Sequence, residues 1–353
     1  MARVVRHGEN RAARGAPEPR LRVAGALRAA FGALVVVGAL ALPARTNAAD
    51  DEMVPRGAIL VRVQATQEDQ REGIATDDKQ HPLLYLAFPD PAQRDLVTGS
   101  IERDVKITET LATYGLTDRL NLSLALPFVE IRQTSSLATA STDAALTARL
   151  AQLQARSVSG LGDIRLTLLH RPVFNDTDGF LVGYGVTLPG EDFRSAYIGQ
   201  MTLATASPYW SLNLILHYTR YFLALERARL DLRFHGRFAQ NATVTMTDGT
   251  KAQLDPPNAG GGSLTWEQEF DTLGYSVGIY HETTLSARIN EVDQNDPTRE
   301  TRLSAQLMAG NLSKLETGRL RFPFQAGIRA DAVVYAFNFA LATRIGAFFQ
   351  TYF

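Results

Sequence analysis

The sequence predicts an all-β fold, a single antiparallel transmembrane β-barrel of about twelve strands that follows an N-terminal signal peptide. Three observations lead to this fold class. The chain opens on a basic and then apolar leader, and its later segments alternate apolar and polar residues over unusual lengths. It ends on an aromatic-rich segment whose last residue is Phe353.

Residues 1–48 have the three parts of a secretory signal peptide. Seven arginines lie between Arg3 and Arg28, an uncharged apolar run follows from Ala29 to Leu42, and small residues surround the expected cleavage site at Ala48. The apolar run is shorter than the roughly 20 residues of a transmembrane helix, which argues against the alternative of a membrane anchor. We therefore expect residues 1–48 to be cleaved on export and residues 49–353 to form one barrel domain.

The composition excludes several classes of protein. The chain has no cysteine, so it has no disulfide framework, cysteine nucleophile or cysteine metal site. The full chain carries a net charge of −1, and the leader alone holds eight arginines against Glu9 and Glu18. Because the leader accounts for +6, residues 49–353 carry −7, which argues against nucleic acid as a partner. No motif indicates a cofactor or a metal site.

Period-2 alternation is clearest from Leu230 to Phe238. Apolar residues there alternate with the polar residues Asp231, Arg233, His235 and Arg237. Such alternation places apolar side chains on one face of a strand and polar ones on the other. The same pattern in a soluble sandwich would bury the leucines in a core, so alternation alone does not choose between the two folds.

Length and spacing favour the barrel. About twelve segments alternate in this way, and several reach the 9–11 residues that a tilted membrane strand needs. They lie at 56–68, 99–116, 119–134, 159–174, 180–193, 206–222, 228–246, 261–271, 274–290, 299–313, 318–332 and 337–353. Long and short connections alternate between them, as in outer-membrane barrels, except for a short last gap at 333–336. The few residues between leader and first strand predict no N-terminal plug, so a plug would have to come from 69–98 or 135–158.

The C-terminal segment, 345–353, is rich in aromatic residues and ends on Phe353. It resembles the terminal strand by which outer-membrane barrels are recognised for assembly, with Phe349 and Phe353 as the signal residues. This resemblance implies the barrel-assembly machinery as a partner, outer-membrane lipid as the surroundings and a Gram-negative-type bacterium as the host. The alternative is a buried terminal strand of a soluble sandwich.

Three motifs between residues 114 and 190 resemble one known family. They are the hairpin Tyr114–Phe128, the segment Ser159–Leu166 with its Gly-Leu-Gly-Asp sequence, and the strand end Tyr184–Gly190. Together they resemble the family called MetA-pathway of phenol degradation, although the last motif lacks the family's threonine. The resemblance implies an outer-membrane barrel that passes small hydrophobic or aromatic compounds by passive diffusion. Asp163 in the second motif is expected to cap a loop entry or to point inward, with a structural role favoured over substrate contact.

If the apolar side chains face lipid, their polar neighbours face the barrel interior. The predicted interior residues are Arg165, His217, Asp231, Arg233, His235, Arg237, Glu267, Glu269, Glu282, Arg288, Arg302, Arg319, Arg321, Arg329 and Arg344. Arginines and acids that oppose each other across a narrow barrel would pair. The pairs would form either a network that fills and stiffens the barrel or a charged pathway through it.

Two rival functions remain beside a channel. One is a structural or adhesive barrel whose interior is closed by its charges. The other is a barrel-embedded hydrolase, for which Ser211, Asn213, His217 and His235 are the nearest candidates. These four lie on the predicted inner face, away from lipid, and no G-x-S-x-G nucleophile motif occurs. We therefore predict that the chain is not an enzyme and has no catalytic residue.

Overall fold

The computed structural model describes residues 53–74, 80–88, 91–190, 204–222, 224–225, 228–245, 250–270, 272–294, 297–310 and 323–353. The predicted leader, residues 1–48, lies outside this part of the chain, and so do Arg319 and Arg321. Within it, no helix is long and apolar enough to cross a lipid bilayer.

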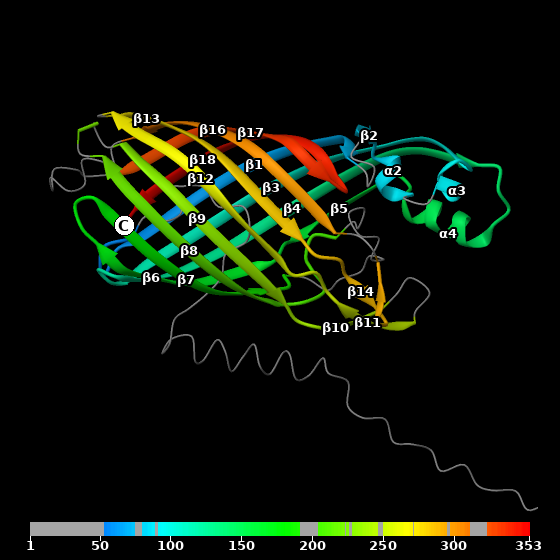
Figure 1. The fold of residues 1–353 in the computed structure, drawn as a ribbon, viewed down its shortest axis with the longest axis horizontal. Coiled ribbons are helices and arrows are strands. Elements are labelled where there is room, and N and C mark those ends of the chain that lie inside the picture. Colours follow the sequence, from blue (N-terminus) through cyan, green and yellow to red (C-terminus); the bar gives the residue numbers. More distant parts are fainter. Residues whose placement is uncertain are drawn as a thin grey trace, which may run out of the picture. The chain divides into compact units, whose positions relative to one another are not determined.

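Twelve long antiparallel strands of the described residues form a closed barrel (Figure 1). They are β1 (Ile59–Ile74), β3 (Val97–Thr117), β4 (Leu120–Thr139), β6 (Ile164–Phe174), β7 (Asp178–Leu188), β8 (Ser211–Phe222), β9 (Ala228–Ala239), β12 (Ala259–Phe270), β13 (Leu273–Thr284), β16 (Thr298–Gly310), β17 (Phe324–Phe337) and β18 (Phe339–Tyr352). The barrel closes because β1 pairs with both β3 and β18. The predicted fold class, a single antiparallel barrel of about twelve strands, is confirmed.

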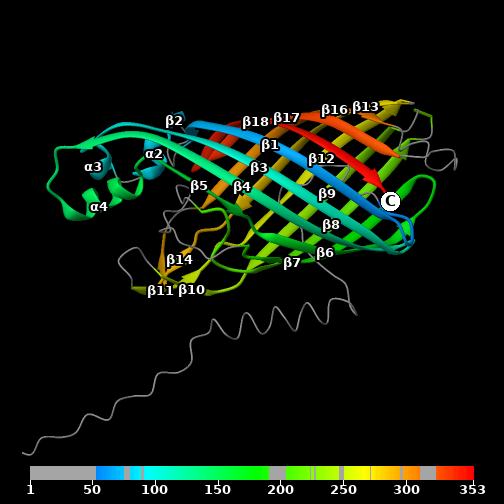
Figure 2. The ribbon, with the colours of Figure 1, turned by 180° about the vertical axis from the view of Figure 1, so that it is seen from behind.

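The two ends of the barrel differ. At one, here called the turn end, short connections join β3 to β4, β6 to β7, β8 to β9 and β12 to β13. At the other, the loop end, lie β2 (Gln80–Pro82), the helices α2 (Leu84–Ala87), α3 (Pro91–Arg94) and α4 (Ala144–Gln152), and a small sheet of β10 (Ala242–Thr245), β11 (Lys251–Asp255), β14 (Arg288–Ile289) and β15 (Val292–Asp293). Figures 1 and 2 show α2, α4, β11 and β14 beyond this same end.

The short last gap predicted from the sequence is a short connection at the loop end, and β17 and β18 pair with each other only up to Ala332 and Thr343. Only Asn338 separates β17 from β18, and its φ of 49° places it in the left-handed region that asparagine tolerates. The predicted alternation of long and short connections therefore holds at the loop end except at this connection. The connection 311–322 at the turn end lies outside the described residues.

The two faces of the wall have opposite chemistry. On β9, Leu232 and Phe234 are 37% and 52% exposed, whereas Asp231 and Arg233 are only 4% and 7% exposed. A barrel has a single wall, so the buried polar side chains point inward and the exposed apolar ones outward. The exposed apolar residues of the wall include Val63, Leu126, Phe128, Leu212, Leu264, Ile279, Leu303, Leu307, Ile328 and Ile345.

The wall is interrupted where the sequence predicted one continuous strand, 159–174. The strand β5 (Arg156–Leu161) and β6 are separated by Gly162 and Asp163, although both pair with β4. Asp163 accepts hydrogen bonds from the backbone N of Ser207 at 2.7 Å and from its Oγ at 2.6 Å. The carboxylate thus anchors the long connection between β7 and β8, the structural role expected for it.

The segment before β1, predicted to be too short for an N-terminal plug, reaches into the turn end of the barrel. Val54 is fully buried. With the amide nitrogen of Asn121 on β4 turned toward it, the Val54 oxygen accepts a hydrogen bond from that nitrogen at 3.1 Å. Met53 packs against Leu169, Leu181 and Ile215, which are buried on the inner face of β6, β7 and β8. A turn makes this return possible, because Gly57 adopts a φ of 82° before β1 begins. Three residues, Met53–Pro55, therefore suffice to enter the turn end of the barrel.

Gly115 in the first family-like motif gains a physical explanation from this segment. A Cβ at position 115 would clash with the carbonyl oxygen of Pro55. The backbone N of Gly57 also donates to the Gly115 oxygen at 2.8 Å, and the Gly115 N donates to the Ala58 oxygen at 3.0 Å. Glycine at this position therefore lets the N-terminal segment lie against β3.

Candidate functional site

A cavity of about 360 Å³ lies inside the barrel and extends from its middle toward the loop end. Its volume is in the range of small-molecule sites. Eleven of the twelve barrel strands, all except β12, contribute to its wall, together with the loop residues Asp163, Ser207 and Tyr209. The charged residues that line it are Glu109, Asp163, Arg165, Arg237, Glu282, Glu300, Arg302, Arg329, Asp331 and Arg344.

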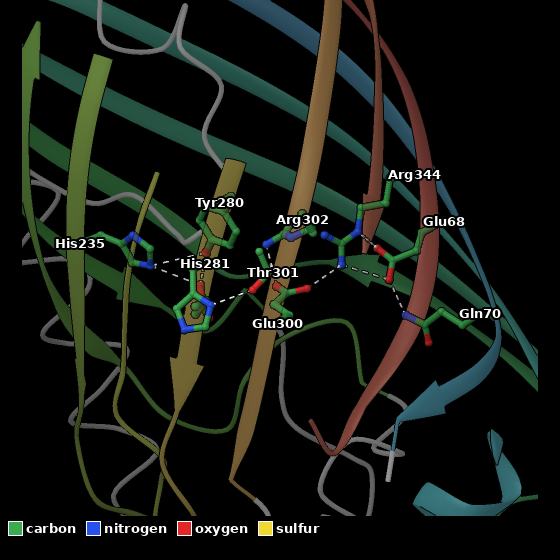
Figure 3. Close-up of polar contacts among 10 residues, drawn as sticks. Glu68, Gln70, His235, Tyr280, His281, Glu300, Thr301, Arg302 and Arg344 are labelled. Atoms are coloured by element: carbon green, nitrogen blue, oxygen red, sulfur yellow. Dashed lines mark hydrogen bonds and ion pairs between the residues drawn. The ribbon is translucent and has the colours of Figure 1, made fainter. Parts of the chain in front are cut away.

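One chain of contacts begins where the barrel closes (Figure 3). Arg344 on β18 donates from Nε to Glu68 Oε2 on β1 at 2.5 Å, and its Nη2 lies 3.8 Å from Glu300 Oε2 on β16. Glu300 also accepts from Arg302 Nη2 at 2.6 Å. Gln70 adds a donor to Glu68. All four charged side chains are buried, so their pairing offsets the cost of removing them from water.

The chain of contacts continues through an aromatic ring to β9. The guanidinium of Arg302 lies 4.2 Å from the ring centroid of Tyr280, a cation–π contact. The hydroxyl of Tyr280 donates to Glu282, whose Oε2 also lies 3.3 Å from His235 Nε2. The rings of His235 and Tyr280 are parallel, with centroids 5.7 Å apart. Figure 3 shows this row of side chains between β9 and β1.

A second network lies nearer the turn end. His217 Nε2 on β8 is 2.9 Å from Asp231 Oδ1 on β9, and Arg229 Nε is 3.2 Å from Asp231 Oδ2. Arg229 also reaches Glu267 Oε1 on β12 at 2.9 Å. The predicted residues His217, Asp231 and Glu267 are therefore brought together, with Arg229 as the link between the acids.

The other predicted residues have varied positions. Arg165 forms an ion pair with Glu109, and Arg329 Nε donates to Asp331 at 2.8 Å. Glu269 accepts from Gln325 at 3.2 Å. Arg233 is buried on β9.

The placement of Arg288 on a barrel strand is wrong. Arg288 belongs to β14, which pairs with β11 and β15 in the small sheet at the loop end, and its side chain is exposed. The predicted segment 274–290 ends as a barrel strand at Thr284. The residues after Thr284 lie at the loop end, so alternation there does not indicate which side chains face the barrel interior.

Several members of these networks were not predicted from the sequence, namely Glu68, Glu109, Arg229, Glu300 and Asp331. Arg229 is two residues before Asp231 on β9, so the same alternation would have predicted that Arg229 also faces the interior. Glu68 lies at the last position of the predicted segment 56–68, whereas β1 continues to Ile74. Its importance depends on the pairing of β1 with β18, which local sequence does not encode.

The arrangement does not assemble the hydrolase considered from the sequence. Ser211 and His217 are six residues apart on one strand, roughly 20 Å along an extended chain. Asn213 donates to Thr187 Oγ1 at 3.0 Å, and His217 and His235 contact different carboxylates. Among the described residues no group of three or more His, Asp or Glu is placed to hold a metal ion.

The terminal residues close the wall. The backbone N of Phe353 donates to the Ile59 oxygen at 2.8 Å, and the Ile59 N donates to the Phe353 oxygen at 3.0 Å. Phe349 faces outward, 42% exposed, and pairs in register with Val63. Their role as an assembly signal stays a prediction.

Comparisons with known proteins agree with this fold. No family model matches the chain, and no curated protein gives a significant sequence match. An outer-membrane channel from Pseudomonas putida F1 superposes with a TM-score of 0.64 at 16% identity, over 88% of this chain and 100% of that one. The shared barrel agrees, at the level of fold, with the family resemblance of residues 114–190.

Two other solved barrels overlap less well. The transport unit of the autotransporter AIDA-I from Escherichia coli gives a TM-score of 0.44 at 6% identity, covering 93% of this chain and 98% of that one. The monoaromatic hydrocarbon channel CymD gives a TM-score of 0.38 at 9% identity, covering 85% and 88%.

Proposed function

We propose that this chain is an outer-membrane channel through which small hydrophobic or aromatic compounds diffuse passively, and that it is not an enzyme. The observation that carries the proposal is a closed barrel with an apolar outer face and a charged interior that keeps a cavity of about 360 Å³. The shared fold with a bacterial outer-membrane channel supports it.

The outer face supports a location in lipid. Large apolar side chains on neighbouring strands are exposed together, among them Phe234 on β9, Leu264 on β12, and Ile279 on β13. Soluble monomers rarely expose apolar patches of this extent. The partners of this surface are then outer-membrane lipids, reached after export with a cleaved leader and insertion by the barrel-assembly machinery.

The substrate class follows from two supports of different kinds. The resemblance of residues 114–190 to the MetA-pathway of phenol degradation family implies small aromatic or hydrophobic compounds. The cavity itself has aromatic and aliphatic walls, with Tyr209, Tyr280, Phe348 and Val129 among its lining residues. Apolar contact of this kind is what binds an aromatic ring in a protein pocket.

Reconstitution of the purified protein in planar bilayers tests the proposal. We expect stable conductance steps that a neutral aromatic probe, benzamide, reduces in a concentration-dependent way. Heat-denatured protein serves as the control. Hydrolysis of the bilayer lipid would instead support the enzyme.

A silent bilayer would favour the second candidate, a structural or adhesive barrel. One observation speaks for it, because Met53 and Val54 fill part of the turn end. A barrel that neither conducts nor binds benzamide would overturn the channel proposal and leave this candidate.

Cysteine labelling tests the location in lipid separately, since the native chain has no cysteine. In Leu232→Cys, an attached fluorophore should be quenched by quenchers carried on acyl chains. In Arg233→Cys, the neighbouring position should escape these quenchers and react only with reagents that enter the barrel. The opposite pattern would contradict a membrane-spanning barrel, because facing alternates residue by residue along a strand.

A further inference from the structure

Arg237 on β9 lines the cavity near the loop end. Five arginines line this cavity. Four of them, Arg165, Arg302, Arg329 and Arg344, form ion pairs with acids. Within the described residues Arg237 forms none, and its buried Nε has no hydrogen-bond partner. Leaving the buried Nε of this partly buried arginine without a partner is unfavourable, and the guanidinium lacks an acid of its own, so this position is prepared for an anion.

The acids that interact electrostatically with Arg237 are already engaged elsewhere. Its electrostatic neighbours are Tyr209, Glu282, Asp163 and Tyr280. Both carboxylate oxygens of Asp163 accept hydrogen bonds from Ser207, and Glu282 contacts Tyr280 and His235. These two carboxylates lower the positive potential at Arg237 without forming an ion pair with it.

The walls around Arg237 define the rest of the ligand. Tyr209 and Tyr280 line the same cavity, and so do Ile107, Phe339 and Phe348. A flat apolar ring fits such walls, while a carboxylate on that ring meets the planar guanidinium with two parallel hydrogen bonds.

We propose that Arg237 is the recognition residue of a binding site for small aromatic monocarboxylates inside the barrel. This inference rests on the proposed channel function and narrows its substrate class. The site disfavours dianions, because a second carboxylate would approach Asp163 and Glu282. The ligand therefore carries one negative charge at one end of an apolar body.

The test compares three probes on the reconstituted protein, benzoate, its neutral isostere benzamide and the dianion phthalate. Binding is measured by calorimetry in detergent and by block of conductance in planar bilayers. We expect wild-type protein to bind benzoate at least about tenfold more tightly than benzamide or phthalate, the gain of one charge-assisted bidentate pair.

Arg237→Gln should remove the preference for benzoate and leave the binding of benzamide unchanged. Arg237→Lys should keep only part of the preference for benzoate, because lysine retains the positive charge but lacks the planar guanidinium that donates two parallel hydrogen bonds. Arg220→Gln is the matched control, since Arg220 pairs with Asp178 at the turn end, away from the cavity. Folding of each variant is checked by its heat-modifiable migration on a gel.

Glu282→Gln gives an independent test, because the direction of its effect on benzoate affinity separates the two explanations. Removing a negative charge near Arg237 should tighten benzoate binding, whereas a purely structural role of this network predicts weaker binding of both benzoate and benzamide. This variant keeps the inference testable if Arg237→Gln fails to fold.

The outcomes separate the inference from the function on which it rests. If the wild-type protein neither conducts nor binds any probe, the channel proposal fails. If it conducts and binds benzamide, but benzoate binds no better and Arg237→Gln changes nothing, the channel stands and the carboxylate site is overturned.

Discussion

The two halves of the barrel interior are filled in different ways. In the turn half, Met53 packs on Leu169, Leu181 and Ile215, and Val54 is fully buried. In the loop half, paired charges line a cavity of about 360 Å³. The same wall of alternating strands supports both. Both halves contain buried ion pairs, but only the turn half is also packed by the N-terminal segment, whereas the loop half keeps the cavity.

The largest effect is expected from breaking the charged network in the loop half. Arg344→Met leaves Glu68 and Glu300 buried without their shared cation. Loss of one partner of a buried ion pair costs about 3–5 kcal/mol, so the free energy of unfolding in urea should fall by this amount. The control is Arg220→Met at an exposed ion pair. Equal destabilisation by the two variants would contradict the view that the loop half depends on its buried charges.

A smaller loss of stability, joined to a gain in conductance, is expected from the turn half. Val54→Ser replaces a fully buried valine side chain with a polar one. Full burial of a valine side chain contributes about 1.5–3 kcal/mol to stability, and the variant should lose part of it. Together with Met53→Ser it should loosen the N-terminal segment. Single-channel conductance should then rise in planar bilayers. Arg56→Ser, at an exposed residue of the same segment, is the control, and unchanged conductance in the double variant would show that the segment does not limit passage.

The smallest effect is expected at the outer edge of the turn end. Asp178 there accepts hydrogen bonds from Thr177, Tyr218 and Arg220. These groups lie at the surface, where water and salt screen the ion pair. Asp178→Asn should shift the urea midpoint only slightly, and added salt should reduce the difference from wild type. A loss comparable to that of Arg344→Met would remove the distinction between buried and exposed pairs.

The strands and their facing could be predicted from the sequence because both depend on neighbouring residues. On β9, the alternation of Leu232 and Phe234 with Asp231 and Arg233 reports the two faces of one strand, and the structure has the same alternation of burial. Each predicted segment overlaps one strand of the barrel wall. The break at Gly162 was not predicted, and it coincides with a contact that local sequence does not encode, between Asp163 and Ser207 of a different loop.

Positions beyond the strands could not be predicted by the same signal. Arg288 alternates like a strand residue but belongs to the small sheet at the loop end. The N-terminal segment is too short to show any periodicity, and its entry into the barrel depends on Gly57, Gly115 and Asn121. These three residues come from separate parts of the chain that meet only in the folded barrel.

The sequence by itself determined an all-β chain of about twelve long strands and the side of each strand that is apolar, because period-2 alternation is a local property. Only the tertiary structure decided which interior side chains meet. Glu68 and Arg344 are 276 residues apart and pair because β1 closes the barrel against β18. Register and closure likewise left Arg237 without a direct partner among the described residues. The alternation along a strand predicts that an arginine faces inward. Whether its charge is paired or can bind a ligand depends on the side chains of other strands that lie next to it in the barrel.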